Sequence, residues 1–520
     1  GIFDPEGTNP NPFNSSPYSQ EFKILSKFWS NLPAYQMGKQ IVQTIKSNDV
    51  VLIKSATGSG KSVLIPPFAL HSLNYSGHIV MTLPKKIITK KAAEFASKVL
   101  DVKLGEQIGY QFRGENLKSN KTIMLYSTDG SVISMLKSDP LLKSVDLIII
   151  DEAHERKVNI DLLLYLLKNA IDKRKKKNIS PLKLIIMSAT INEQIFQTYY
   201  ADFNFEWLEL SGTPNHPIKS IYLESSLNLE TNQYLDMGKQ IIEQIITGIN
   251  DSNPEYVEGD ILFFVCTISE CDKLALELSS IYSDCFVMGL YSGFDSELEQ
   301  YISNPTKFKE LNPNFKRRIF ISTNVAESSL TIDGIVYVID SGLELSVKFD
   351  PTANINAMTK NFVTQAQMIQ RKGRAGRTKP GICYHLYTPQ EQMDAIKFPE
   401  PEIKSIDLKN TCLSMMRICS ELKLCSNKSS KSSKSSKSSK SSKNKFRKMC
   451  TVEKTIDMFL HFIEPPGEKF ITNGFEFGYS NLLISETNNK LTKIGRLVLD
   501  SRLDVMDGLS LLWAHNISNL

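Results

Sequence analysis

Cysteine is sparse and unevenly distributed in this chain of 520 residues. The first 265 residues contain none, and no two of the eight cysteines form a C-x-x-C pair. Metal sites and disulfide frameworks depend on closely spaced or numerous cysteines, so we expect neither here. Because disulfides are rare where thiols are kept reduced, the same scarcity favours an intracellular, reducing compartment such as the cytoplasm or nucleus.

Long apolar runs are also absent. No segment reaches the roughly 18 uninterrupted apolar residues of a membrane span, so we expect no membrane contact. The first 20 residues are polar and lack the apolar centre of a secretory signal. Their Pro and Asn content predicts a flexible N-terminal extension over residues 1–30.

Acidic residues are missing between Lys428 and Lys448, where nine Lys and Arg residues lie. The formal net charge of the chain is +5, and without these nine residues it is −4. A role in nucleic-acid binding must therefore be argued from individual residues at defined positions rather than from overall charge. The Lys-Ser-Ser repeat in this stretch cannot bury a core, so we expect residues 426–448 to be a disordered insert. The insert is either a solvated spacer or a basic arm that holds RNA by counterion release.

Short apolar runs rich in Val and Ile alternate with longer helical stretches over most of the chain. This alternation is typical of βαβ units and a parallel sheet. The first series of predicted strands is 50–54, 78–83, 122–127, 145–150 and 182–187. The second series is 260–265, 285–290, 318–322, 334–339 and 381–386. We therefore predict two α/β domains in tandem, divided near residues 211–217, where Gly, Pro and Asn cluster. Beyond them we predict helices over 406–424 and 452–462.

A glycine-rich loop lies between the first predicted strand and the helix that follows it. The sequence Ser55-Ala-Thr-Gly-Ser-Gly-Lys-Ser62 suits backbone N–H groups that wrap phosphates. In such a loop Lys61 reaches the β- and γ-phosphates and Ser62 holds Mg²⁺. Ser55 stands where the usual pattern has its first glycine, so an ordinary strand–helix turn stays an alternative. The predicted nucleotide-binding residues of the loop are Thr57, Gly58, Ser59, Gly60, Lys61 and Ser62.

Two carboxylates follow the apolar strand at 147–150. Asp151 lies 90 residues after Lys61 in the chain. A Mg²⁺ site needs a carboxylate at the carboxyl end of a strand beside the phosphate loop, and Asp151 fits that place, holding the ion through water. Glu152 is placed to polarise an attacking water. The alternative is a solvated acidic turn.

A cluster of arginines lies in the second α/β domain, in Gln370-Arg-Lys-Gly-Arg-Ala-Gly-Arg377. Phosphoryl transfer needs positive charge on the equatorial oxygens of the transferred group, which an arginine finger supplies. Arg374 and Arg377 are three residues apart and share one face of a helical turn, which suits two fingers. The alternative is a basic surface helix.

In this order, these segments resemble the DEAH-box helicases of superfamily 2, and the resemblance covers about residues 30–510. Further segments match the family's motifs in sequence order. They are Thr82-Leu-Pro-Lys-Lys86, Ser127-Thr-Asp-Gly130, Asp151-Glu-Ala-His-Glu-Arg156, Ser188-Ala-Thr190, 259–264, Leu290-Tyr-Ser292 and 322–334. The resemblance implies two RecA-like domains, 31–213 and 214–390. A mostly helical winged-helix domain over 391–505 would follow, with residues 506–520 beginning a ratchet-like helix in a shortened or minimal member.

The resemblance also implies an ATP-dependent RNA helicase that uses ATP or another NTP with Mg²⁺. It would move 3′ to 5′ along single-stranded RNA and unwind a duplex with a 3′ overhang, without sequence preference and as a monomer. By resemblance, the water and the γ-phosphate would meet Glu152, Asp151, Gln370, Arg374 and Arg377, and Asp333 would face the nucleotide. Coupling of hydrolysis to domain movement falls to His154, Ser188 and Thr190. Contacts to the nucleic-acid backbone fall to Lys85, Lys86, Thr128, Ser292 and Thr323.

Several alternatives stay open at this point. Phe95 stands where the family has a base-stacking arginine, and it is either a stacking aromatic or a core residue. Strand character at 345–350 predicts either the family's duplex-separating β-hairpin or a plain edge hairpin. The basic run at 172–178 reads as a solvated turn or a localisation signal. DNA, or both nucleic acids, could replace RNA as the substrate, and an NTP-gated RNA clamp that does not unwind is a further alternative.

Overall fold

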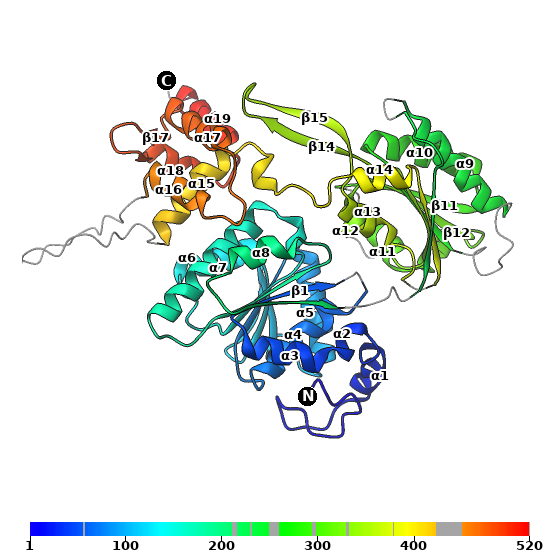
Figure 1. The fold of residues 1–520 in the computed structure, drawn as a ribbon, viewed down its shortest axis with the longest axis horizontal. Helices are drawn as coiled ribbons and strands as arrows, with labels where there is room; N and C mark the ends of the chain where they lie inside the picture. The colour runs from blue at the N-terminus through cyan, green and yellow to red at the C-terminus, as the bar shows by residue number, and fades with distance from the viewer. Residues whose placement is uncertain are drawn as a thin grey trace, which may run out of the picture.

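The computed structural model describes residues 1–55, 58–210, 216–228, 231–248, 259–293, 298–328, 332–377, 379–422 and 450–518. Two parallel-sheet domains are followed by a mostly helical C-terminal part, which lies against the first domain (Figure 1). The predicted tandem of α/β domains is therefore confirmed.

The sheet of domain 1 has eight strands in the order β4-β3-β5-β2-β6-β7-β1-β8. All neighbours are parallel except β4, which runs antiparallel to β3. The five predicted strands are present, whereas β3, β4 and β8 were not predicted because they lie toward the edges and lack a continuous Val/Ile run. The strands are β1 Val50–Ser55, β2 Ile79–Leu83, β3 Ile108–Phe112, β4 Glu115–Leu117, β5 Met124–Thr128, β6 Leu147–Ile150, β7 Lys183–Ser188 and β8 Phe205–Leu210.

Helices cover both faces of this sheet, as the two separate cores on either side of its strands show. They are α1 Gln20–Trp29, α2 Pro33–Gln36, α3 Gly38–Ser47, α4 Lys61–Ser72, α5 Lys86–Val99, α6 Asp129–Ser138, α7 Val158–Lys176 and α8 Glu193–Tyr199, with the 3₁₀ turn η1 Ala153–Glu155. None of the helices in the described part of the chain combines the length and apolarity needed to cross a membrane.

The N-terminal segment is part of domain 1. Ile2, Phe22 and Trp29 are 1–2% exposed. The Asn11 side chain donates to the Leu100 carbonyl at 3.0 Å. The prediction of a flexible extension over 1–30 is therefore wrong, because apolar and aromatic side chains spaced among its polar residues pack against helices α3 to α5.

The basic run at 172–178 is also not a solvated turn throughout, because most of it belongs to α7. Arg174 is fully buried. Its guanidinium donates to the carbonyls of Ser180 at 2.6 Å, Leu142 at 3.0 Å and Val145 at 2.8 Å. The five donors of one guanidinium suit such a cluster of carbonyls. Arg174 thus ties the end of α7 to the segment that leads into β6.

We expect Arg174→Met to lower the free energy of unfolding by about 3 kcal/mol or more, because it leaves several buried carbonyls without donors. Lys175→Met is the matched control, since Lys175 is the next residue of the same helix and is exposed. Urea denaturation of the two variants measures the difference. Equal midpoints would show that the carbonyls find other partners.

Domain 2 is built on a six-stranded parallel sheet in the order β11-β12-β10-β13-β16-β9. Its strands are β9 Ile218–Tyr222, β10 Asp260–Phe264, β11 Cys285–Leu290, β12 Arg317–Ser322, β13 Ile335–Asp340 and β16 Gly381–His385. Its helices are α9 Gln233–Thr247, α10 Ile268–Ile281, α11 Glu299–Ser303, η4 Lys307–Glu310, α12 Val325–Ser328, α13 Gln365–Lys372 and α14 Pro389–Asp394. The predicted second series of strands is thus found, with β9 added.

An antiparallel hairpin of β14 Leu343–Asp350 and β15 Ile355–Phe362 projects from domain 2 toward the C-terminal part (Figure 1). This confirms the strand character predicted at 345–350. The described C-terminal elements are η5 Glu402–Lys404, α15 Lys409–Glu421, α16 Val452–Leu460, α17 Glu468–Ser480, β17 Ile484–Ser485, β18 Lys490–Leu491, α18 Lys493–Ser501 and α19 Val505–Ser518.

The C-terminal part shares one continuous core with domain 1. Met416 and Phe459 belong to the same buried cluster as Leu163 of α7. The helices predicted over 406–424 and 452–462 correspond to α15 and α16. The winged-helix and ratchet assignments stay predictions, and the insert at 426–448 lies outside the described residues.

A disulfide joins Cys419 and Cys450, with the two Cα atoms 5.7 Å apart. The sequence predicts no disulfide framework, and it gives no sign of this pair, because the two cysteines are 31 residues apart and carry no pairing motif. Folding brings the end of α15 against the segment that enters α16, and this places the two side chains together. The other cysteines of the described chain are free and buried.

Candidate functional site

The predicted phosphate loop, acidic pair and Ser188-Ala-Thr190 segment lie at one edge of the domain 1 sheet. They follow β1, β6 and β7, and β7 lies between the other two strands in the sheet. Because the carboxyl ends of parallel strands meet at the same edge, segments up to 135 residues apart in the chain (Ser55 to Thr190) become neighbours. In open α/β sheets this edge is where ligands bind.

The phosphate loop turns sharply before α4 begins at Lys61. Gly58 and Gly60 have φ of +85° and +86°, the left-handed region that favours glycine. A Cβ added to Gly60 would lie 2.7 Å from the Leu32 side chain. The backbone N–H of Ala34 donates to the Ser59 carbonyl at 3.0 Å. Leu32 and the first turn of α2 therefore hold the loop in place. The predicted residue Thr57 lies outside the described residues.

Ser55, the departure from the usual glycine, is the last residue of β1. It pairs with Leu210 in the sheet and is 1% exposed. As part of a strand it has extended backbone, which any residue adopts. The sequence at this position therefore imposes no strain on the entry to the loop.

We expect Ser55→Gly to keep NTP turnover close to that of the unaltered chain and to cost about 0.5–1 kcal/mol of stability, since glycine weakens a strand. Gly60→Ala is the contrasting variant, because alanine there meets both a positive φ and the Leu32 side chain. Phosphate release assays on both variants check this. Loss of activity in Ser55→Gly would show that the Ser55 side chain is needed.

Lys61, Ser62 and the acidic pair are in direct contact. The Lys61 ammonium lies 3.4 Å from Glu152 Oε2. The Ser62 hydroxyl donates to Asp151 Oδ2 at 2.9 Å. Hydroxyl and carboxylate oxygens at this spacing are the ligands that Mg²⁺ prefers, so these residues fit a magnesium ion.

Burial controls the protonation of this cluster. It raises the pKa of Asp151 to about 7, and the neighbouring Glu152 carboxylate adds to this effect, while Lys61 opposes it. Burial also acts to raise the pKa of Glu152, but the positive charges of Lys61, His154 and Arg374 outweigh it and hold that pKa below its usual value. Glu152 is thus the carboxylate that stays ionised, as a group that accepts a proton must.

Arginines from domain 2 face this cluster. Arg374 follows α13, is 3% exposed and donates to the Glu327 carbonyl. Burial, together with the neighbouring Arg377, lowers the pKa of Arg374 to about 9. Arg374 and Glu152 influence each other's charge although they lie on different domains. Burial lowers the pKa of Arg377, and the Asp333 carboxylate opposes this effect. The predicted residues Asp333, Arg374 and Arg377 therefore share the domain 2 side of the site.

A direct hydrogen bond links the two domains beside the site. Gln370 Nε2 donates to Thr190 Oγ1 at 2.9 Å. The Ser188 hydroxyl donates to the Thr190 carbonyl at 3.2 Å, and so fixes the turn that carries it. His154 Nδ1 lies 3.3 Å from Glu152 Oε2. Of the three predicted coupling residues, Thr190 therefore contacts domain 2, Ser188 supports Thr190, and His154 lies beside Glu152.

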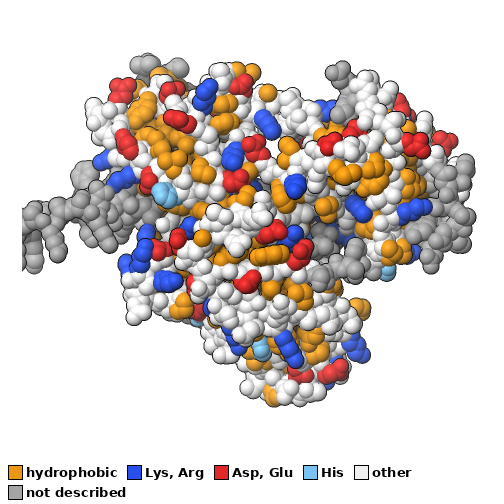
Figure 2. Space-filling view, viewed as in Figure 1, with side chains coloured by type: hydrophobic (Ala, Val, Ile, Leu, Met, Phe, Trp, Pro, Cys, Tyr) orange, Lys and Arg blue, Asp and Glu red, His pale blue; other side chains and the backbone are white. Residues whose placement is uncertain are grey.

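The predicted nucleic-acid residues form two groups, one on each domain. Lys85 and Lys86 are exposed, and Thr128 is half-buried. They follow β2 and end β5, which are paired at that edge. Ser292 is exposed and Thr323 half-buried, beyond the paired ends of β11 and β12. On the face in Figure 2, acidic and basic side chains are interspersed, so no single charged patch marks a path there.

Phe95 is 41% exposed on α5. The core alternative is therefore wrong for this residue, because a packed core side chain is shielded from water. Stacking on a base stays open.

Sequence reasoning missed two buried ion clusters around the site. Arg371 is fully buried and binds Glu327 at 3.1 Å and Asp340 at 3.0 Å. Arg156 binds Asp161 at 2.7 Å and Glu464 at 2.6 Å. Both arginines lie inside the quoted motifs, but nothing in the sequence indicates that Glu327 and Asp340 pair with Arg371 or that Glu464 pairs with Arg156.

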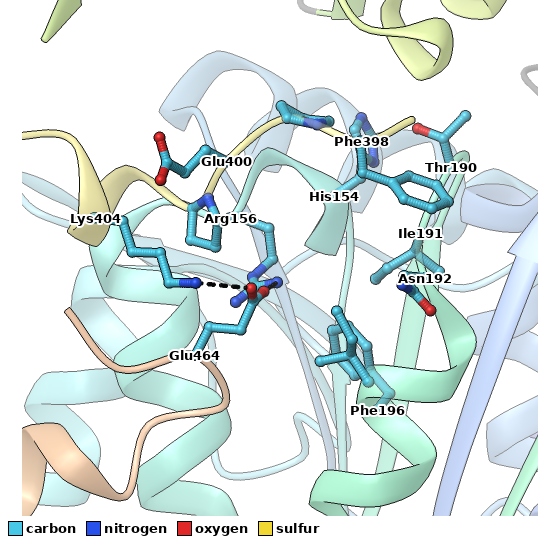
Figure 3. Close-up of a pocket in the computed structure, with 13 residues that line it drawn as sticks. His154, Arg156, Thr190, Ile191, Asn192, Phe196, Phe398, Glu400, Lys404 and Glu464 are labelled. Atoms are coloured by element: carbon cyan, nitrogen blue, oxygen red, sulfur yellow. Dashed lines mark hydrogen bonds and ion pairs between the residues drawn. The ribbon is translucent and has the colours of Figure 1, made fainter. Parts of the chain in front are cut away.

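A cavity of about 170 Å³ lies beside the acidic motif, where domain 1 meets the C-terminal part. Figure 3 shows Phe398 beside His154 and Thr190, with Phe196 on the opposite side. Lys404 pairs with Glu464 at 3.1 Å on the cavity wall. The cavity is lined in part by the same Glu464 that binds Arg156, so its walls depend on the docking of the C-terminal part.

Two family models match the chain in the order of its domains. The DEAD/DEAH box helicase model matches residues 35–198, and the helicase conserved C-terminal domain matches residues 241–379. These ranges hold both halves of the site just described. The chain belongs to the DEAD/DEAH-box helicase family. Its own version of the family's signature is Asp151-Glu-Ala-His154.

Other members of the DEAD/DEAH-box helicase family are similar over most of this chain. The protein named "Putative ATP-dependent RNA helicase L540" of Acanthamoeba polyphaga mimivirus is 41% identical over 80% of this chain and 58% of its own length. The ATP-dependent RNA helicase HrpA of Borreliella burgdorferi is 34% identical over 74% of this chain and 45% of its own. The chain thus spans about half the length of these relatives.

The crystal structure of Escherichia coli DEAH/RHA helicase HrpB has a similar fold. It matches 92% of this chain with a TM-score of 0.70 and 24% identity, over 54% of its own length. The two sheet domains are therefore of the predicted RecA-like type.

Proposed function

We propose that this chain is an ATP-dependent RNA helicase, which couples NTP hydrolysis to 3′–5′ movement along single-stranded RNA. The observation that carries the proposal is the bond between Gln370 and Thr190, with Arg374 acting on Glu152 across the same interface. A site completed by two domains hydrolyses NTP only when they close, and this links chemistry to movement. The names of the mimivirus and Borreliella relatives, which both describe ATP-dependent RNA helicases, support this activity.

In the proposed reaction the phosphate loop holds the NTP at the N-terminus of α4. Lys61 leaves Glu152 to reach the β- and γ-phosphates, which frees Glu152 to orient the attacking water and take its proton. Mg²⁺ held by Ser62, and by Asp151 through water, would neutralise charge on the phosphate oxygens. Gln370 positions the water, and Arg374 and Arg377 stabilise the charge of the transition state. Asp333 faces the nucleotide from domain 2.

Movement follows from the two backbone-binding groups on separate domains. Lys85, Lys86 and Thr128 grip the strand from domain 1, and Ser292 and Thr323 grip it from domain 2. Opening and closing of the cleft changes the distance between these grips. Because the contacts are to the backbone, they carry no sequence information, and any single-stranded sequence suits them.

The domain assignment belongs to this proposal. Residues 31–213 and 214–390 act as the two RecA-like motor domains. Residues 391–505 form a winged-helix domain, and residues 506–520 begin a ratchet-like helix. We also propose that the protein acts as a monomer.

The test measures NTPase activity with and without single-stranded RNA or DNA, and displacement of a duplex with a 3′ overhang. We expect RNA-stimulated hydrolysis and displacement. If DNA stimulates hydrolysis as strongly as RNA does, this would favour a protein that uses both nucleic acids as substrates. Hydrolysis without displacement would favour an NTP-gated RNA clamp, and absence of hydrolysis would overturn the proposal.

A further inference from the structure

The β14–β15 hairpin and the helix that leads to the arginine fingers form one connected unit. β15 ends at Phe362, and α13 begins at Gln365. The N–H of Val363, between them, donates to the Gly342 carbonyl at 2.8 Å, just before β14. Movement of α13 therefore reaches β15 through the covalent chain and β14 through its pairing with β15, and direct bonds from α13 to β14 fix the angle between the helix and the hairpin.

One such bond joins Gln367 of α13 to Glu344 of β14. Gln367 Oε1 accepts the N–H of Thr364 at 2.9 Å, and this is half of the capping box that begins α13. Because the amide oxygen is used in the cap, the amide nitrogen faces the other way. It donates to Glu344 Oε2 at 2.8 Å. The helix cap thus fixes the direction of the bond to the hairpin.

A second bond joins Arg371, one helical turn further along α13, to the first residue of β14. Arg371 Nη1 donates to the Leu343 carbonyl at 3.1 Å and to Asp340 Oδ1 at 3.0 Å. Arg371 is fully buried, three residues before the proposed finger Arg374. Two successive residues of β14, Leu343 and Glu344, are therefore held by one helix.

The far end of the hairpin rests on the C-terminal part (Figure 1). The N–H of Phe349 donates to the Ser405 carbonyl at 2.8 Å. The Phe349 ring packs edge-on against Phe470, with ring centroids 6.0 Å apart. The hairpin thus spans from the finger helix to a different part of the molecule.

We infer that Glu344 is a positioning residue that makes the hairpin follow the arginine-finger helix during turnover. The inference rests on the proposed NTP-driven movement and adds the link through which it reaches the hairpin. Glu344 accepts from Gln367 on α13 and is not one of the residues proposed to bind the nucleotide, so we expect its loss to leave hydrolysis intact. Without its bond, the hairpin stays attached through β15 and through the Arg371–Leu343 bond, but it can pivot at its base, so cycles of hydrolysis no longer set its position against the C-terminal part.

The experiment compares Glu344→Ala with Glu344→Gln. Both substitutions remove the carboxylate charge, but only alanine removes the oxygen that accepts from Gln367. We expect Glu344→Ala to keep basal NTPase activity and to displace at least about fivefold less duplex per NTP hydrolysed, the lower end of a typical coupling between sites. We expect Glu344→Gln to stay close to the unaltered chain. Equal thermal unfolding midpoints exclude a general loss of structure.

A reciprocal exchange isolates the bond. Gln367→Glu keeps the cap oxygen but sets two carboxylates against each other, so it should uncouple like Glu344→Ala. The double variant Glu344→Gln with Gln367→Glu restores a donor and an acceptor, and coupling should return.

Displacement per NTP that is unchanged in Glu344→Ala, or not restored in the double variant, would overturn the inference. Failure of the proposed function shows separately, as absence of hydrolysis or displacement in the unaltered chain. If the unaltered chain hydrolyses NTP without displacement, the same variants are compared by RNA stimulation of NTPase activity. Equal stimulation in Glu344→Ala then overturns the inference.

Discussion

Replacing Glu152 by glutamine is expected to lower NTP turnover by about 10²–10⁴-fold, the usual contribution of a positioned general base. Glutamine keeps the shape of the side chain but cannot take the proton of the attacking water. Nucleotide binding should persist, because the phosphate loop and Lys61 are unchanged. Removing the carboxylate that lies 3.4 Å from Lys61 also frees its ammonium, so affinity should stay equal or rise.

Single-turnover phosphate release and binding of a fluorescent nucleotide analogue separate these two effects. Glu206→Gln is the matched control, because the same chemical change falls on an exposed residue of the edge strand β8. If Glu152→Gln hydrolyses NTP at the rate of the control, another group takes the proton and the proposed mechanism is wrong.

Replacing Arg374 by alanine is expected to lower kcat by about 10³–10⁵-fold, the range known for arginine fingers. Arg374 is 3% exposed and acts on Glu152 from the opposite domain. A charge that acts in the transition state affects kcat more than KM. Arg374→Lys should recover only a small part of the rate, because an ammonium cannot form the forked contacts of a guanidinium.

Lys379→Ala controls for loss of positive charge near this helix, since Lys379 is exposed. Thermal unfolding of Arg374→Ala shows whether the fold is kept, and Arg374→Gln offers a less severe truncation. A fold-competent Arg374 variant with a kcat within tenfold of the unaltered chain would remove Arg374 from the mechanism.

The two predictions test different halves of one site. Glu152 belongs to domain 1 and Arg374 to domain 2, and the hydrogen bond from Gln370 to Thr190 lies between them. Both variants should therefore lose RNA-stimulated turnover, although each leaves the opposite domain unaltered. Such a result would show that neither domain hydrolyses NTP by itself.

The sequence by itself determined the two strand series and the order of the motifs. Continuous Val and Ile runs identify buried parallel strands, and each motif residue is fixed by its place after a strand. Lys61, Ser62, Asp151 and Glu152 could thus be predicted as neighbours, since parallel strands end at one edge. The edge strands β4 and β8 escaped prediction because partly exposed strands have no continuous apolar run.

Only the tertiary structure decided which charged side chains are buried and which distant segments of the chain are in contact. Arg174 reads as part of a solvated basic run, yet it is fully buried among carbonyls. The N-terminal segment reads as an extension, yet Phe22 and Trp29 lie in the core of domain 1. The acidic partners of Arg371 lie 31 and 44 residues away, and Glu464 lies 308 residues from Arg156. A local pattern cannot specify such pairs, because a buried charge is stable only beside the partner that the complete fold brings to it.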